Sequence, residues 1–302
     1  MTTPIRKNRW FDPGFILLAL MILGCSMSPE KQSHVTPIRS SDSAGEFLSG
    51  KTGGVISFDE MIRDLSDVDI IYIGETHTNP QHHYLQYTII QVLHKMGYEL
   101  TVGMEMIDHT YQKVLDEWTS GGLDESAFLE KTHWYANWRY DFELYRNILL
   151  FLKQNKIPLL GLNIPFHIPP KISIGGIDSL SEEEQKHLPE RIDITYTEHR
   201  AYISEIFKAH RIKGRNNFEY FYLAQCTWED AMAERIASGF KKGKIIVLAG
   251  NGHIIKKFGI PDRAFARVRK SFRTLYLSSP EEEIDPSFGD YIWIGFKEKG
   301  RN

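Results

Sequence analysis

Two short segments place a histidine three residues after a glycine, each directly behind a run of apolar residues. The first segment ends in Glu75 and His77, the second ends in His253, and Glu105 follows the apolar run between them. Imidazole and carboxylate groups together can bind a divalent metal or transfer protons as general acids and bases. One histidine at such a position more often has a structural role. The combination of Glu75, His77, Glu105 and His253 nevertheless predicts a functional site, with His77, Glu105 and His253 as candidate metal ligands.

The apolar runs in front of these residues are typical of buried parallel strands. We expect strands at 68–73, 99–104, 157–162, 244–249, 274–277 and 291–296, and helices at 80–96, 109–130 and 142–155. Strands that alternate with helices predict an α/β fold with a mainly parallel sheet and helices on both faces. Ligands of such sheets bind beyond the carboxyl ends of the strands. The four candidate residues should therefore meet in one cleft at that edge.

Further along the chain, residues from about 180 to 240 read as successive helices without a strand. We interpret them as a helical insertion or subdomain on the α/β core. Aromatic residues at 134–140 are expected to pack in the core. The adjacent His82 and His83 point about 100° apart on a helix, so at most one of them can join the site.

The first 24 residues resemble the signal peptide of a bacterial lipoprotein. Arg6, Lys7 and Arg9 precede an apolar run at 15–23, and small residues lead to Cys25. The run is shorter than the roughly 20 residues that span a bilayer, so it is read as a secretion signal. We expect lipid on Cys25, a flexible tether over 25–54, and one domain over 55–302. By resemblance to lipoprotein sorting, the residue after Cys25 suggests the outer membrane of a Gram-negative bacterium.

Composition excludes some classes of partner. Lys and Arg number 36, Asp and Glu number 39, and the net charge is −3. Nucleic-acid binding, which calls for a basic face, is not expected. Cys25 and Cys226 are the only cysteines of the sequence. With lipid on Cys25, no disulfide can form within the chain.

Several motifs together resemble the haem-binding ChaN-like lipoprotein family. They are IYIGETHTNPQHHYLQ, GMEM, RYDFELYRNIL, GLNIP, WEDAMAERIA, LAGNGHI and GIPDR, in that order between about residues 66 and 265. The wider superfamily includes erythromycin esterases and Tiki-type metalloproteases, and its two glycine-x-x-histidine elements and intervening glutamate match His77, His253 and Glu105. The resemblance implies an α/β/α fold and binding of haem in iron acquisition. It also implies a homodimer that holds haem between its subunits, with a tyrosine on the iron and a histidine nearby.

The expected helical insertion offers Tyr196, His199, Tyr202 and His210 as haem candidates. His199, Tyr202 and His210 follow a spacing that puts them on one helix face. A tyrosinate oxygen suits ferric iron. The alternative is that the same stripe is an amphipathic face that packs on the core.

Two functions are consistent with these patterns. The first is a haem-binding surface lipoprotein in haem or iron uptake, with haem as its cofactor and the membrane as a partner through the lipid. The alternative is a metal-dependent hydrolase that uses Glu75, His77, Glu105 and His253 to activate water. The sequence has no Gly-x-Ser-x-Gly elbow and no zincin helix motif, so the usual serine and zinc routes are not supported.

The lipid anchor is directly testable. A Cys25→Ser variant removes the only thiol that can accept the acyl chain at this position, so it should lose palmitate labelling and leave the membrane fraction. Metabolic labelling and fractionation measure both effects. Unchanged labelling of the variant would show that Cys25 is not the lipidated residue.

Overall fold

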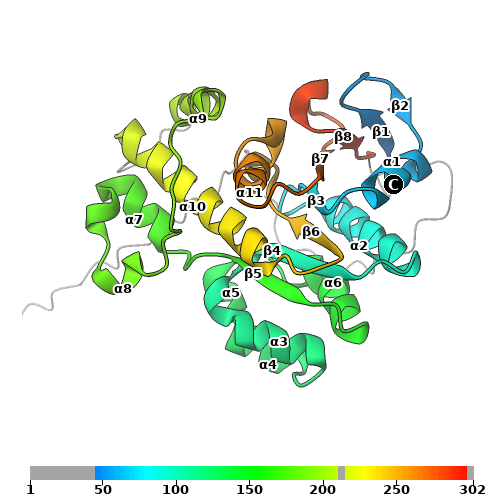
Figure 1. Ribbon diagram of the computed structural model, residues 1–302, viewed down its shortest axis with the longest axis horizontal. Coiled ribbons are helices and arrows are strands. Elements are labelled where there is room, and N and C mark those ends of the chain that lie inside the picture. Colours follow the sequence, from blue (N-terminus) through cyan, green and yellow to red (C-terminus); the bar gives the residue numbers. More distant parts are fainter. Residues whose placement is uncertain (1–44, 210–214, 298–302) are drawn as a thin grey trace, which may run out of the picture.

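The computed structural model describes residues 45–209 and 215–297. Within these residues one sheet has the strand order β2-β1-β8-β7-β3-β6-β4-β5 (Figure 1). The strands are β1 (Glu46–Ser49), β2 (Val55–Ile56), β3 (Ile70–Ile73), β4 (Leu100–Asp108), β5 (Leu159–Asn163), β6 (Lys244–Leu248), β7 (Phe272–Ser278) and β8 (Tyr291–Ile294). Strands β3 to β8 run parallel to one another, and β1 is antiparallel to both β2 and β8.

Helices cover both faces of this sheet. On one face lie α1 (Phe58–Ser66), α2 (Pro80–Lys95), α3 (Gln112–Ser120), α4 (Glu125–Lys131), α5 (Trp134–Asn137) and α6 (Glu143–Gln154). On the other face lie α9 (Thr197–Ala209), α10 (Phe218–Gly239) and α11 (Ile260–Val268), as Figure 1 shows. Helix α7 (Ile168–Gly175) packs on α10, and the short α8 (Glu182–Gln185) comes after it. The predicted α/β fold with a mainly parallel sheet is confirmed.

Short 3-10 helices complete the described elements. They are η1 (His109–Tyr111), η2 (Ile177–Ser179), η3 (Asn251–His253), η4 (Ile255–Lys257) and η5 (Pro286–Phe288). Two of them lie at the carboxyl edge of the sheet: η1 comes directly after β4, and η3 comes soon after β6. This edge is therefore built from tight turns that point side chains beyond the strand ends.

The alternation of side chains along β3 explains the two layers. Ile71 and Ile73 belong to the core under α1 to α6, whereas Ile70 and Tyr72 belong to the core under α9 to α11. Successive side chains of a strand point to opposite faces, so a strand buried on both faces must be apolar at every position. All four residues are buried.

The start of α2 fixes the path of the chain after β3. Asn79 caps the helix because its side chain accepts a hydrogen bond from the Gln81 amide, and Pro80 occupies the first helical position. The chain therefore turns from His77 into α2 within a few residues. As a result, the first turns of α2 lie beside the carboxyl end of β3.

Two predicted boundaries need correction. The tether expected over 25–54 overlaps β1, which pairs with β8, so residues 46–49 belong to the sheet and not to a tether. The region expected as an insertion, about 180–240, includes α10, whose apolar side chains fill the core beside β5 and β6. Helix α10 is the crossover between these parallel strands, so any insertion is limited to the residues before it.

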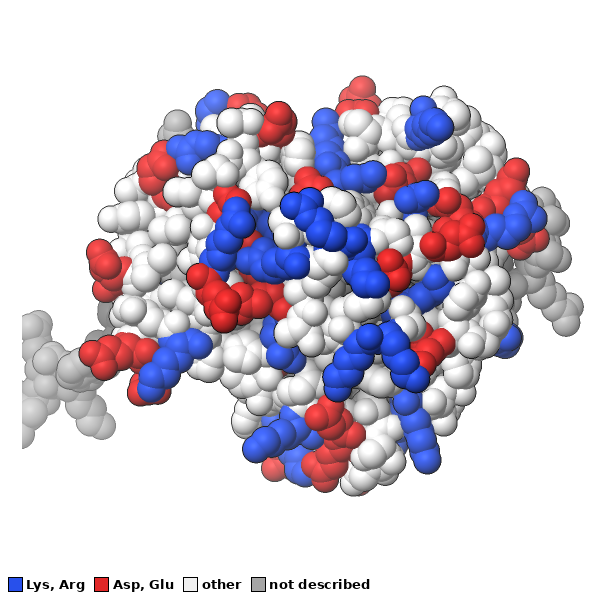
Figure 2. All heavy atoms as spheres, in the orientation of Figure 1, with Lys and Arg blue, Asp and Glu red and all other residues white. Residues whose placement is uncertain are grey.

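The N-terminal predictions fall outside the structure. The signal peptide over 1–24 and Cys25 lie outside the described residues. No helix within 45–209 or 215–297 is long and apolar enough to cross a membrane. On the face shown in Figure 2, acidic and basic side chains are interspersed, with fewer charges toward the side where α7 lies.

Candidate functional site

The structure brings Glu75, His77, Glu105 and His253 together at the carboxyl edge of the sheet. Glu75 and His77 come after β3, Glu105 lies within β4, and His253 comes after β6. Because β6 lies between β3 and β4 in a parallel arrangement and Met104 pairs with Leu248, the last residue of β6, Glu105 is level with the ends of β3 and β6. Residues that are almost 180 positions apart in the chain therefore share one cluster.

The buried carboxylate of Glu75 contacts and orients His77. Its Oε1 atom lies 2.8 Å from Nδ1 of His77 and accepts a hydrogen bond of 2.7 Å from the Tyr145 hydroxyl. Its Oε2 atom accepts a 2.9 Å hydrogen bond from Gln86 and lies 3.5 Å from Nδ1 of His83. Burial alone would raise the pKa of Glu75, but the nearby imidazoles and hydrogen bonds outweigh it and lower the pKa to about 2. Glu75 is therefore an anion that orients the His77 ring.

His253 lies between two carboxylates. Its Nε2 atom is 3.4 Å from Glu105, and its Nδ1 atom is 3.3 Å from Glu229 and 3.2 Å from the Gln225 amide nitrogen. Burial favours the neutral ring, yet Glu105 and Glu229 raise the pKa of His253 to about 10. Glu105 also accepts a 2.7 Å hydrogen bond from the Gly250 amide. His253 is thus a buried cation with both ring nitrogens engaged.

Aromatic rings frame the cluster. Trp138 and Tyr140 lie 4.7 and 5.0 Å from the His77 ring, and Trp228 lies 4.8 Å from the His253 ring. The His77 side chain is 22% exposed, whereas that of His253 is 6% exposed. His77 is therefore the imidazole of this cluster that a molecule from solvent can reach.

Gly250 allows the two glycine-x-x-histidine turns to approach each other. A Cβ atom at Gly250 would lie 3.0 Å from Cε1 of His77, and one at Gly74 would lie 2.0 Å from the Asn251 side chain. Asn251 also donates a 2.7 Å hydrogen bond to the carbonyl of Leu277, which ties the second turn to β7. A side chain at either glycine would push the turns apart.

Several buried polar residues of the site were not predicted from the sequence. Glu229, Gln225, Arg263, Tyr145 and Gln86 surround the predicted four and come from α2, α6, α10 and α11. At most one of the adjacent histidines was expected to join the site. His83 contacts Glu75, whereas His82 accepts a hydrogen bond from the Thr76 amide. The sequence signal that could have pointed to some of these residues was the pair of acidic residues inside the otherwise apolar segment WEDAMA.

The haem candidates lie on the α9 side of the molecule. His199 is buried, with Nε2 3.3 Å from Glu229, so it faces the core. Tyr202 is half-buried and packs against apolar residues that include Phe258. Tyr196 is half-buried and lines a pocket of about 140 Å³ together with His199 and Phe258. His210 lies outside the described residues.

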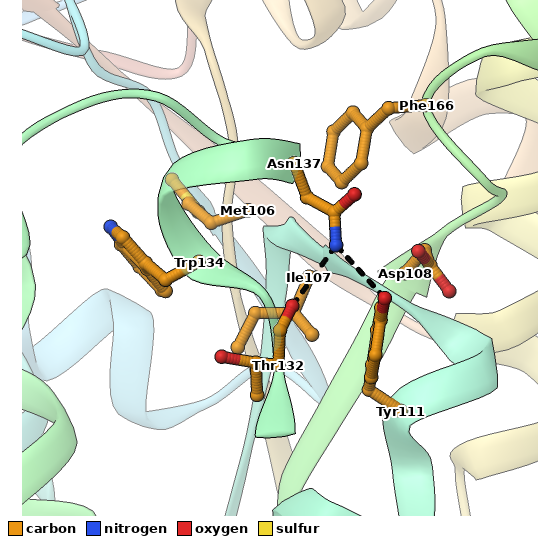
Figure 3. Close-up of a pocket in the computed structure, with 8 residues that line it drawn as sticks. All are labelled: Met106, Ile107, Asp108, Tyr111, Thr132, Trp134, Asn137 and Phe166. Carbon is orange, nitrogen blue, oxygen red and sulfur yellow. Dashed lines mark hydrogen bonds between the residues drawn. The ribbon is translucent and has the colours of Figure 1, made fainter. Parts of the chain in front are cut away.

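A second pocket, of about 170 Å³, opens beside the candidate site (Figure 3). The amide of Asn137 crosses it and donates hydrogen bonds of 3.0 Å each to the Tyr111 hydroxyl and the Thr132 carbonyl. The Phe166 ring on its wall lies 5.9 Å from Trp138, the ring that also contacts His77. This pocket is small and largely closed by its own hydrogen bonds.

The arrangement supports proton transfer at His77. Its Nδ1 atom is held by an anionic carboxylate and its side chain is 22% exposed, as in other carboxylate–imidazole pairs that act as general bases. Among residues 45–209 and 215–297, no three histidine, cysteine, aspartate or glutamate side chains are placed so that they could hold a metal ion. The assignment of His77, Glu105 and His253 as metal ligands stays a prediction.

Solved structures share this fold. One of them, described as cofacial haem binding to ChaN of Campylobacter jejuni, is 23% identical and covers 86% of this chain and 100% of its own, with a TM-score of 0.70. An erythromycin esterase in its open conformation is 13% identical over 78% of this chain and 77% of its own, with a TM-score of 0.45. The type III effector HopBA1 is 17% identical over 80% of this chain and 93% of its own, also at 0.45. Scores this low carry no functional argument, and the ChaN likeness at this identity establishes the fold.

No protein of curated function matches the sequence. A family model described as haem-binding uptake, Tiki superfamily, ChaN matches residues 61–264, which include the whole candidate cluster. The resemblance seen in the sequence motifs is thereby confirmed. The chain belongs to the ChaN-like family of haem-binding uptake proteins within the Tiki superfamily.

Proposed function

We propose that this protein binds haem for haem and iron uptake, as a lipoprotein anchored through Cys25 in the outer membrane of a Gram-negative bacterium. The family match over residues 61–264 carries this proposal. The C. jejuni ChaN structure, described as showing cofacial haem binding, supports it because all of that chain is covered. Bound haem would supply a ferric iron that takes an oxygen or nitrogen ligand from the protein.

The two pockets described above are small. Pockets for ligands of drug size measure about 300–1,000 Å³, whereas these two measure about 170 and 140 Å³, so neither would enclose a haem. We place haem on an outer face of the chain, with a second copy of the chain as the opposite wall, in line with the cofacial haem binding described for C. jejuni ChaN.

Tyr196 is the iron ligand that we favour. It lines the smaller pocket, and the Arg263 guanidinium lies 5.3 Å from its ring. Burial raises the pKa of both tyrosines, which opposes loss of the proton needed for a phenolate ligand, and it raises the pKa of the more deeply packed Tyr202 to about 12. For Tyr196 the nearby Arg263 acts in the opposite direction. In this proposal His199 is a wall of the pocket, because its ring is directed to Glu229.

Titration with ferric haem tests the ligand. The Tyr196→Phe change keeps the ring and removes only the oxygen, so folding should survive while the high-spin phenolate spectrum is lost. We expect affinity to fall by about tenfold or more, which corresponds to roughly 1.4 kcal/mol. Visible absorption spectra of the purified full-length protein measure both effects.

Two further variants serve as controls. Tyr202→Phe should retain the phenolate spectrum if Tyr196 is the ligand. Tyr135→Phe changes an exposed tyrosine on α5, far along the chain from the haem candidates, and should behave like the unchanged protein. Loss of the phenolate spectrum in Tyr202→Phe alone would identify Tyr202 as the iron ligand. A protein that binds no haem would contradict the proposal.

A shared haem also predicts a change of mass. If haem fills the space between two copies, its binding energy is available to the dimer alone, so haem shifts monomer toward dimer by mass action. Sedimentation velocity with and without ferric haem should show this shift in the unchanged protein. An identical mass in both conditions would rule out the shared site.

A hydrolase is the second candidate, and the Glu75–His77 pair favours it. An imidazole held by a buried anion and open on one side can take a proton from water or from a hydroxyl group. Glu105 and the cationic His253 lie on the other side of the cluster and could stabilise charge there.

Ester hydrolysis tests that candidate. The His77→Gln change removes the base, so kcat/KM for p-nitrophenyl esters should fall by about 10²-fold or more. His94→Gln is the matched control, because that half-buried histidine lies at the far end of α2. Assays with and without a chelator separate metal-dependent from metal-free hydrolysis. Equal rates in both variants would eliminate the cluster as a hydrolytic site.

A further inference from the structure

The carboxylate of Glu229 connects two groups of buried residues. It lies in the middle of α10 and is fully buried. On one side, Oε1 is 3.3 Å from Nδ1 of His253 and accepts a 2.7 Å hydrogen bond from Gln225. On the other side, Oε2 is 3.3 Å from Nε2 of His199 and 3.4 Å from Nε of Arg263. Each oxygen of Glu229 therefore faces positive or donor groups from a different element.

Arg263 forms an ion pair with this carboxylate, with its Nε 3.4 Å from Oε2. The guanidinium is buried, contacts Asp230 through an ion pair, and donates hydrogen bonds to the Asp193 carbonyl and the Cys226 sulfur. These contacts fix Arg263 from α10 and from the segment before α9. A salt bridge buried this completely is costly to form, because both ions lose their hydration.

Gly259 lets α11 come close enough for the contact. Its φ is +69°, and a Cβ atom there would lie 2.8 Å from Oε1 of Glu229. The left-handed backbone and the close approach both require glycine. The turn before α11 is thus shaped around the Glu229 carboxylate.

The orientation of the His253 ring depends on this carboxylate. Oε1 of Glu229 accepts a hydrogen bond from the Gln225 amide and lies 3.3 Å from Nδ1 of His253, so it contacts both nitrogens of the 3.2 Å pair. Without this carboxylate, Nδ1 would face the Gln225 amide alone. Rotation of the ring would then release Nε2 from Glu105, 3.4 Å away.

We propose that Glu229, clamped by Arg263 and His199, is the positioning residue that fixes the His253 ring between Glu229 and Glu105. Held in this way, His253 has both ring nitrogens directed to carboxylates of the protein itself. The imidazole of the cluster left for an incoming molecule is then His77, whose side chain is 22% exposed. The functional role of this arrangement rests on the proposed function, whereas the orientation of the His253 ring does not depend on haem.

The competing explanation is a purely structural salt bridge. In that case Glu229 and Asp230 would be equivalent, since both are buried carboxylates of α10 that pair with Arg263. Glu229 differs from Asp230 in its contact with His253. Glu229→Gln and Asp230→Asn are therefore matched variants that remove the same charge from the same guanidinium by an isosteric change.

Nuclear magnetic resonance of the full chain labelled with ¹⁵N-histidine separates the two explanations. The slowly exchanging Nδ1–H signal of His253, assigned by its disappearance in His253→Gln, should be present in the unchanged protein. We expect it to persist in Asp230→Asn and to be lost in Glu229→Gln. Thermal midpoints should fall in both variants, because each leaves Arg263 with one buried partner fewer.

Persistence of the signal in Glu229→Gln, or its loss in both variants, would overturn the proposal. If Glu229→Gln does not fold, Glu229→Asp replaces it. That variant keeps the charge but shortens the reach, so the signal should be lost or moved upfield, and an unchanged signal would again overturn the proposal. All spectra are recorded without haem, so a failed haem titration and a failed positioning role are distinguishable.

Discussion

An ionised group that leaves water for a protein interior loses several kcal/mol of hydration unless partners replace it. The carboxyl end of this sheet buries Glu75, Glu105, Glu229 and His253 almost completely. Each carboxylate of this set has at least one imidazole or guanidinium within 3.5 Å. The helices beside the sheet are arranged so that α2, α6, α10 and α11 each deliver a donor or a charge to this edge.

Close packing of backbone turns is the second requirement of the site. The turn after β3 and the turn after β6 touch each other through glycines, and the Asn251 side chain fills the space left beside Gly74. The result is that His77 and His253 face the same cluster from adjacent strands while their environments differ. One ring is held by a single carboxylate and partly open, whereas the other is enclosed by two.

The tyrosine and histidine residues on the α9 side of the molecule have two different roles. His199 joins the buried network through Glu229, and Tyr202 packs on the core, so part of the Tyr/His stripe supports the fold. Tyr196 precedes the helix and lines a pocket at its start. The same network therefore runs from the proposed haem side, through Glu229, to the histidine cluster at the sheet edge.

The sequence by itself determined the layered fold and the four residues at the strand ends. Continuous apolar runs can be satisfied only by strands buried on both faces, and the chain order of strands and helices leaves a parallel sheet as the simple solution. Glu75, His77, Glu105 and His253 were accessible to this reasoning because they come directly after such runs or end them. Strand β1 was missed because its four residues, Glu46–Ser49, show no apolar run and gain their hydrogen bonds from β8, some 245 positions later.

Only the tertiary structure decided which partners complete the site. Glu229 and Arg263 lie on helices. The spacing of apolar residues along those helices does not predict where either charged side chain points, because each position is consistent with facing solvent or facing the core. Their roles depend on α10 and α11 crossing the sheet beside β6, and that placement results from packing over the whole face. The sequence could identify where strands end because each strand is marked by a local apolar run, whereas the charges that neutralise one another meet only when distant helices dock.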